Sequence, residues 1–140
     1  MRLIILIFLL GCGDSPFINK ETSGEVRGIP GLENELVFPS QKVILKTYWN
    51  KGPIVSDESK LTIILLDEYG RTIDPPLKLN ILLWMPTMGH GSFPVKVKKL
   101  SQGVYEAQEI FFTMEGYWDI HFQLMENNKV QDEVKWGLEL

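Results

Sequence analysis

The 140-residue chain has one cysteine and two histidines. A single cysteine cannot form an intramolecular disulfide, and it excludes a cysteine-rich zinc or iron–sulfur site. Two histidines are too few for a catalytic zinc site built from three imidazoles. Positive charge is also scarce, because 14 Lys and Arg stand against 18 Asp and Glu, a formal net charge of -4. We therefore expect no nucleic-acid binding.

No hydrophobic run is long enough to cross a membrane as a helix. The longest, from Leu3 to Leu10, would cover only ~12 Å of a hydrocarbon core that is ~30 Å thick. Arg2 precedes the run and Gly11 follows it, which is the layout of a secretory signal. The stretch Leu9-Leu10-Gly11-Cys12 resembles the bacterial lipobox, in which cleavage precedes a cysteine that then carries lipid.

This pattern predicts a signal peptide at 1–11 and a lipid on Cys12 that anchors the protein to a bacterial membrane, facing the extracytoplasmic side. The alternative is that Cys12 is an ordinary thiol beside an apolar segment. Residues 12–39 are polar and rich in Gly and Pro, which argues against regular elements, so we predict a tether with some order near Leu36-Val37-Phe38. The remaining residues, 40–140, form one domain of ordinary size.

Strand patterns dominate the part of the chain after the tether. Helix patterns are weak, and Ala107 is the only alanine. Alternating or β-branched stretches occur at 41–49, 61–66, 77–85, 95–98, 105–112, 118–124 and 130–136, and Asn127-Asn128 fits a hairpin turn. About seven short strands over roughly 100 residues predict an all-β fold, an immunoglobulin-like β-sandwich.

One segment carries residues that can bind a metal. Met85, Met88 and His90 lie within six positions, interrupted by Pro86, which should end the preceding strand, and by glycines that permit a tight turn. Thioether sulfur favours Cu(I), and imidazole accepts either oxidation state of copper. Two sulfurs and one nitrogen suit three-coordinate Cu(I), whereas calcium and magnesium require oxygen ligands.

A purely structural interpretation of the same residues is also open. Met85 is in phase with the alternating apolar residues before it, so it fits the last core position of its strand. His90 could simply bond a backbone carbonyl. His121 lies beside Asp119 and Gln123 on the polar face of a predicted strand, where we expect an ordinary strand histidine or, if that strand passes the loop, a fourth ligand. Met114 and Met125 are predicted to be core residues.

The segment from Met85 to Gly91 resembles the Met-Pro-x-Met-x-His signature of the YtkA-like family of small envelope domains, which is related to the FixH group. The likeness continues with Gly103-Val104-Tyr105, Phe111-Phe112-Thr113-Met114 and Gly116-Tyr117-Trp118, and it spans residues from about 80 to 125. The resemblance implies a β-sandwich on the extracytoplasmic side with a role in copper handling or oxidase assembly. It carries functional residues over only to Met85, Met88 and His90.

Two functions follow as hypotheses. In the first, a lipid-anchored envelope domain binds or delivers copper, with Cu(I) favoured, through Met85, Met88 and His90, and its partner is an envelope copper or oxidase-assembly protein. In the second, the sandwich is a metal-free interaction module, with exposed apolar area near Trp84 and Phe93 and with Met88 buried. We predict no enzyme, because the sequence contains no credible acid–base or nucleophile pair.

Overall fold

The computed structural model describes residues 35–140, so the predicted signal peptide 1–11, the lipidation of Cys12 and most of the predicted tether lie outside the described residues. The described part consists of strands and their connections, and it contains no helix of the length and apolarity needed to cross a membrane. The strands are β1 (Glu35–Val37), β2 (Ile44–Lys51), β3 (Glu58–Leu66), β4 (Lys78–Met85), β5 (His90–Gly91), β6 (Lys96–Ser101), β7 (Val104–Phe111), β8 (Tyr117–Glu126) and β9 (Lys129–Glu139).

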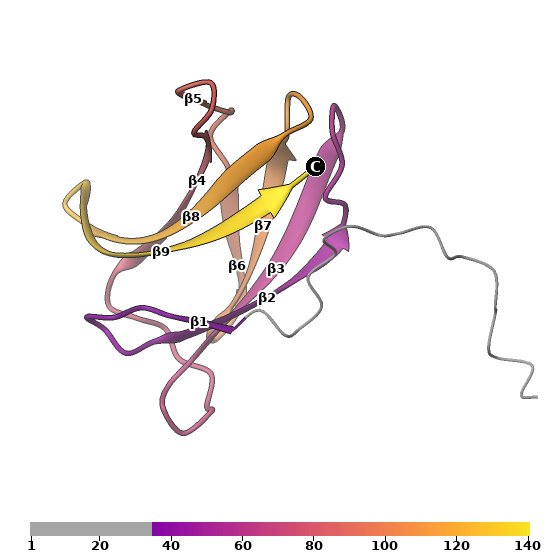
Figure 1. Ribbon diagram of the computed structural model, residues 1–140. Coiled ribbons are helices and arrows are strands. Elements are labelled where there is room, and N and C mark those ends of the chain that lie inside the picture. Colours follow the sequence, from indigo (N-terminus) through magenta and orange to yellow (C-terminus); the bar gives the residue numbers. More distant parts are fainter. Residues whose placement is uncertain (1–34) are drawn as a thin grey trace, which may run out of the picture.

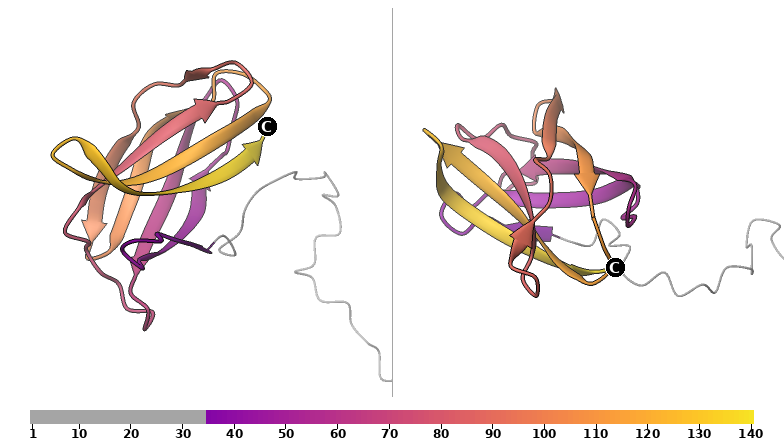
Figure 2. Two further views of the ribbon diagram at one scale, coloured as in Figure 1. Left: turned by 60° about the vertical axis from the view of Figure 1, so that its left-hand side comes forward. Right: turned by 90° about the horizontal axis from the view of Figure 1, so that it is seen from above.

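The strands form two antiparallel sheets that face each other (Figures 1 and 2). One sheet has the order β1-β2-β3-β7-β6, and the other has the order β5-β4-β8-β9. Within them, β2-β3-β7-β6 and β4-β8-β9 reproduce the A-B-E-D and C-F-G orders of an immunoglobulin sandwich. The predicted all-β, immunoglobulin-like fold is therefore confirmed, with the short strands β1 and β5 added to the predicted set.

The core lies between the sheets because every second residue of the long strands faces inward. In β4 the inward set is Leu79, Ile81, Leu83 and Met85, each at most 5% exposed. The inward set of β8 includes Trp118, which is fully buried and stacks edge-on against Phe112 with ring centroids 5.6 Å apart. Alternation in the sequence therefore predicts both the strands and the faces that they bury.

Local turn chemistry sets the strand ends. Asn127 and Asn128 have φ values of 49° and 61°, as a two-residue hairpin between β8 and β9 requires. Strand β4 ends at Met85, immediately before Pro86, as predicted from the missing N–H of proline. Strand β6, which carries Lys96, Lys98 and Lys99, is the edge of its sheet. Lysines on an edge strand oppose pairing with the edge of another molecule.

Regular structure is found before residue 40, in the segment where some order was expected near Leu36-Val37-Phe38. Strand β1 pairs with β2 from Glu35↔Lys46 to Val37↔Ile44, and Phe38 is fully buried in the core. The following turn is held by Asp132 of β9, whose Oδ2 accepts hydrogen bonds from the backbone N–H groups of Ser40 and Gln41, both at 2.8 Å. The local Gly and Pro content does not predict these hydrogen bonds, because Asp132 is distant in the sequence.

Candidate metal site at the β4–β5 turn

A tight turn joins β4 to β5 and brings two candidate ligands side by side. Met85 and His90 are directly opposite each other in the antiparallel pair, and the connecting residues Pro86–Gly89 are called the β4–β5 turn below. The Met85 carbonyl accepts hydrogen bonds from the N–H groups of Met88 (3.2 Å) and Gly89 (2.9 Å). Gly89 has a φ of 66°, which glycine adopts without strain. Directly paired residues have neighbouring Cβ atoms on one face.

The two methionines differ sharply in accessibility. Met85 is only 4% exposed and belongs to the hydrophobic core, which agrees with the packing interpretation of this residue. Met88 is 58% exposed, although it is apolar, and it lies in the β4–β5 turn outside any strand. Packing therefore explains the position of Met85 but not that of Met88.

His90 is half-buried, and its ring orientation is set by two neighbours. Its Nδ1 lies 3.1 Å from the carbonyl oxygen of Gly91, and its ring stacks edge-on against Trp118 with centroids 6.4 Å apart. Because a carbonyl can only accept, this contact favours the tautomer in which Nδ1 carries the proton and Nε2 carries the lone pair. Metal-binding histidines are commonly fixed by this kind of bond from the other ring nitrogen to a backbone carbonyl.

The donor chemistry limits which metal this end of the sandwich can hold. Among residues 35–140, no three His, Cys, Asp or Glu side chains are grouped so that they could bind a metal ion. A site at the β4–β5 turn therefore depends on thioether sulfur from Met85 and Met88, with one imidazole from His90. This set is soft, and it fits Cu(I) better than zinc, calcium or magnesium.

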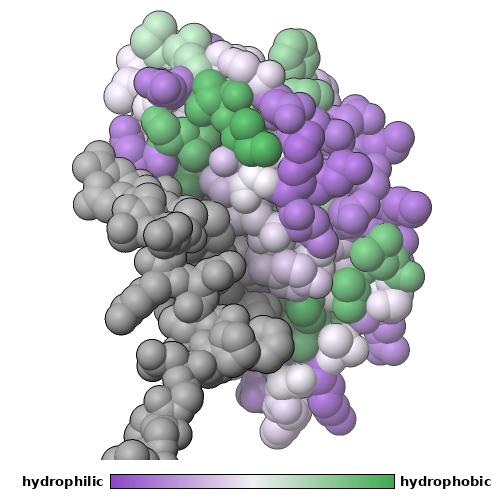
Figure 3. Space-filling model, turned by 90° about the vertical axis from the view of Figure 1, so that its right-hand side faces the viewer, coloured by the Kyte–Doolittle hydropathy of each residue, from purple (hydrophilic) through white to green (hydrophobic). Residues whose placement is uncertain are grey.

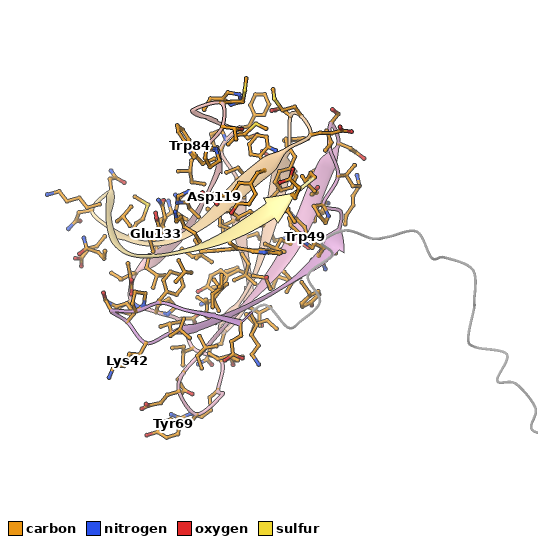
Figure 4. The ribbon with its side chains drawn as sticks, in the orientation of Figure 1. Lys42, Trp49, Tyr69, Trp84, Asp119 and Glu133 are labelled. Carbon is orange, nitrogen blue, oxygen red and sulfur yellow. The ribbon has the colours of Figure 1, made fainter. Side chains whose placement is uncertain are left out.

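His121 lies away from the β4–β5 turn. It pairs with Leu82 on the outer face of the β4-β8-β9 sheet, whereas Met85 faces inward. Its Nδ1 is 3.1 Å from Glu133, and Figure 4 shows Glu133 and Asp119 along this sheet and Trp84 nearer the turn. Burial raises the pKa of Glu133, but hydrogen bonds from Gln123 and His121 outweigh it, so the pKa is lowered overall. His121 therefore belongs to a polar network on the sheet surface.

Two exposed apolar residues lie near the same end: Phe93, where the sequence led us to expect exposed apolar area, and Met114, where it did not. The prediction that Met114 is a core residue is wrong, because it lies in the β7–β8 loop, Phe112–Gly116, and is 38% exposed. Phe93 is 63% exposed and stacks edge-on against Phe111 at 6.1 Å. Figure 3 shows the side of the molecule away from β5, and hydrophobic residues are exposed there near the upper end and again at the lower right. The glycine at 116 was the available sign that strand β7 ends before Met114.

Tyr117 begins β8 on the outer face of its sheet and is 42% exposed. Its neighbour Asp119 raises the pKa of the phenol above its ordinary value by charge repulsion. Trp84 is half-buried on the same outer face. Of Trp84, Tyr117 and Trp118, only Trp118 is fully buried, and its ring stacks against His90.

Comparison with known proteins supports the family resemblance of the segment from Met85 to Gly91. A search of the curated proteins found no match. The family model described as YtkA-like matches residues 50–123, a span that runs from the end of β2 into β8 and includes Met85, Met88 and His90. That match covers more than half of the 140 residues, and the chain therefore belongs to the YtkA-like family.

Proposed function

We propose that this protein is a non-catalytic domain of the bacterial cell envelope, anchored by a lipid on Cys12, that binds Cu(I) through Met85, Met88 and His90 and delivers it to an envelope partner. Membership of the YtkA-like family favours an envelope domain. The copper role rests on donor chemistry, because two thioethers and one imidazole match the preference of Cu(I).

The observation that carries the proposal is the pairing of Met85 with His90 across a turn that contains Met88. This register places a sulfur-bearing and a nitrogen-bearing side chain on one face, with a second sulfur four residues or fewer away from each. The Nδ1 contact with Gly91 leaves Nε2 of His90 as the nitrogen with a lone pair. The 58% exposure of Met88 gives an incoming ion or partner access to one donor.

A second function, a metal-free interaction module, is favoured by Phe93. This residue is 63% exposed next to the β4–β5 turn, and exposed aromatic residues often anchor protein interfaces. The burial of Met88 that this hypothesis expects is not found. The two functions differ in whether partner binding requires copper, so capture of partners from a membrane extract with and without Cu(I) separates them.

The direct test is titration of the full chain with Cu(I) under reducing conditions, in competition with a chromophoric Cu(I) chelator. Met88→Leu and His90→Gln remove one donor each and keep a similar side-chain volume, so each should weaken Cu(I) binding by about 10-fold or more. Met125→Leu is the matched control, because Met125 lies in β8 opposite Lys78, at the other end of the sandwich.

Equal Cu(I) affinity of the wild-type protein, Met88→Leu and His90→Gln would refute the assigned ligands. A general loss of affinity that includes Met125→Leu would point to a folding defect or to nonspecific thioether binding, and it would also count against the site. Retention of the far-ultraviolet circular dichroism spectrum in each variant shows that the fold is unchanged.

A further inference from the structure

The β7–β8 loop, Phe112–Gly116, lies against Met85 at the end of β4. A Cβ added at Gly116 would be 2.6 Å from Cε of Met85, so the loop backbone directly contacts the end of that side chain. Gly116 also exchanges two hydrogen bonds with Leu140, N–H to carbonyl at 2.9 Å and 3.1 Å. These contacts fix the loop between the end of β4 and the C-terminal residue.

The indole ring of Trp118 connects the same loop to the imidazole. Its Nε1 donates a hydrogen bond to the carbonyl oxygen of Met114 at 3.1 Å, while its ring stacks edge-on against His90 at 6.4 Å. Trp118 is fully buried, so it is a rigid support for the Met114 carbonyl and for the His90 ring. The backbone of Met114 is therefore held by the side chain that also positions His90.

The distribution of methionines is uneven. Among residues 35–140 there are four, and Met85, Met88 and Met114 lie at the β4–β5 end, whereas Met125 lies near the β8–β9 hairpin. Met114 is 38% exposed in a loop and Met88 is 58% exposed in a turn, so neither is explained by filling the core. Flexible thioethers at a surface are available for soft metal ions.

We infer that Met114 is a further ligand of the Cu(I) site, which would then offer three thioethers and one imidazole drawn from two loops. This inference rests on the proposed copper function and extends it. With Met114 the site would offer four donors to Cu(I), and without it three. The β7–β8 loop thereby joins the YtkA-like signature as part of one site, although 24 residues separate Met114 from His90 in the sequence.

The experiment compares the full-length chain with Met114→Leu, using Cu(I) as the probe. Two readouts are taken: Cu(I) affinity by chelator competition, and the number of sulfur ligands per copper by X-ray absorption spectroscopy. We expect the wild-type protein to show three sulfurs and one nitrogen, and Met114→Leu to show one sulfur fewer with affinity lowered by about 10-fold or more. Met125→Leu should match the wild-type protein in both.

The outcomes separate this inference from the proposed function. Unchanged affinity and sulfur count in Met114→Leu, together with weaker binding by Met88→Leu and His90→Gln, would overturn the role of Met114 and leave the three-donor site intact. Unchanged binding in all three variants would overturn both. Because Met114 is an exposed loop residue, its replacement by leucine should not perturb folding, and circular dichroism checks this.

Discussion

Asp132 should be a major stabilising residue for the N-terminal part of the domain. The residue is 5% exposed, and its Oδ2 accepts two backbone N–H hydrogen bonds at 2.8 Å, from Ser40 and Gln41. Hydrogen bonds to a charged group contribute about 1.5–3 kcal/mol each. Ser40 and Gln41 are exposed, so in Asp132→Ala water can bond to their N–H groups and offset part of the lost free energy. We therefore expect Asp132→Ala to lower the free energy of unfolding by about 2–4 kcal/mol.

The assay is thermal and chemical unfolding followed by circular dichroism. For a domain of this size the expected loss corresponds to a fall in Tm of about 10–15 °C. Asp132→Asn keeps an acceptor but removes the charge, and charged hydrogen bonds are roughly twice as strong as neutral ones, so it should lose about half as much. The exposed Glu68 serves as the control through Glu68→Gln, which should leave Tm unchanged. An Asp132→Ala variant within about 2 °C of the wild-type Tm would refute the reasoning.

Two further predictions concern the β6–β7 end. Gly103→Ala should cost about 3 kcal/mol or more in denaturant unfolding, because φ is 67° and a Cβ would lie 2.7 Å from the backbone nitrogen of Ile73. Its control, Gly70→Ala, has a similar φ of 77° with nothing within 4 Å, and it should cost only about 1–2 kcal/mol. Equal losses would refute the steric argument.

The Lys99 ammonium, and then the Gly103 N–H, lower the pKa of Asp74 from 3.8 to about 2. A carboxylate with a lowered folded-state pKa stabilises the protein fully above its unfolded pKa and loses that contribution as the pH falls toward 2. Asp74→Asn should thus have a lower Tm than the wild-type protein at neutral pH, and the gap should close between about pH 4 and pH 2. A gap that is constant with pH would contradict this assignment.

The sequence predicts most of this fold because strand periodicity and turn chemistry are local properties. Pro86, Gly103 and Asn127-Asn128 mark ends and turns that the structure contains. The sequence predicts some order near Leu36-Val37-Phe38, but not the capping of Ser40 and Gln41, because Asp132 lies about 90 positions away. No local pattern reports a contact of that separation.

The candidate site also has a part that the sequence predicts and a part that only the tertiary structure shows. The pairing of Met85 with His90 follows from Pro86 and Gly89 between them, both visible in the sequence. The approach of the β7–β8 loop depends on the contact between Gly116 and Met85 and on the Trp118 hydrogen bond, which only the tertiary structure provides. Met114 was assigned to the core because Phe111 and Phe112 before it continue an apolar run, whereas the strand ends there.

The capping of Ser40 and Gln41 by Asp132 has a mechanical consequence. Strand β1 contributes only three paired residues, so a force pulling on Glu35 would first peel β1 from β2. The load would then meet the two bonds to Asp132 and pass into β9, which is paired with β8 from Tyr117 to Glu126. Figure 4 places Lys42, in this loaded turn, at the end of the sandwich away from Trp84 and the β4–β5 turn. Strain entering through the N-terminal segment would thus be absorbed far from Met85 and Met88.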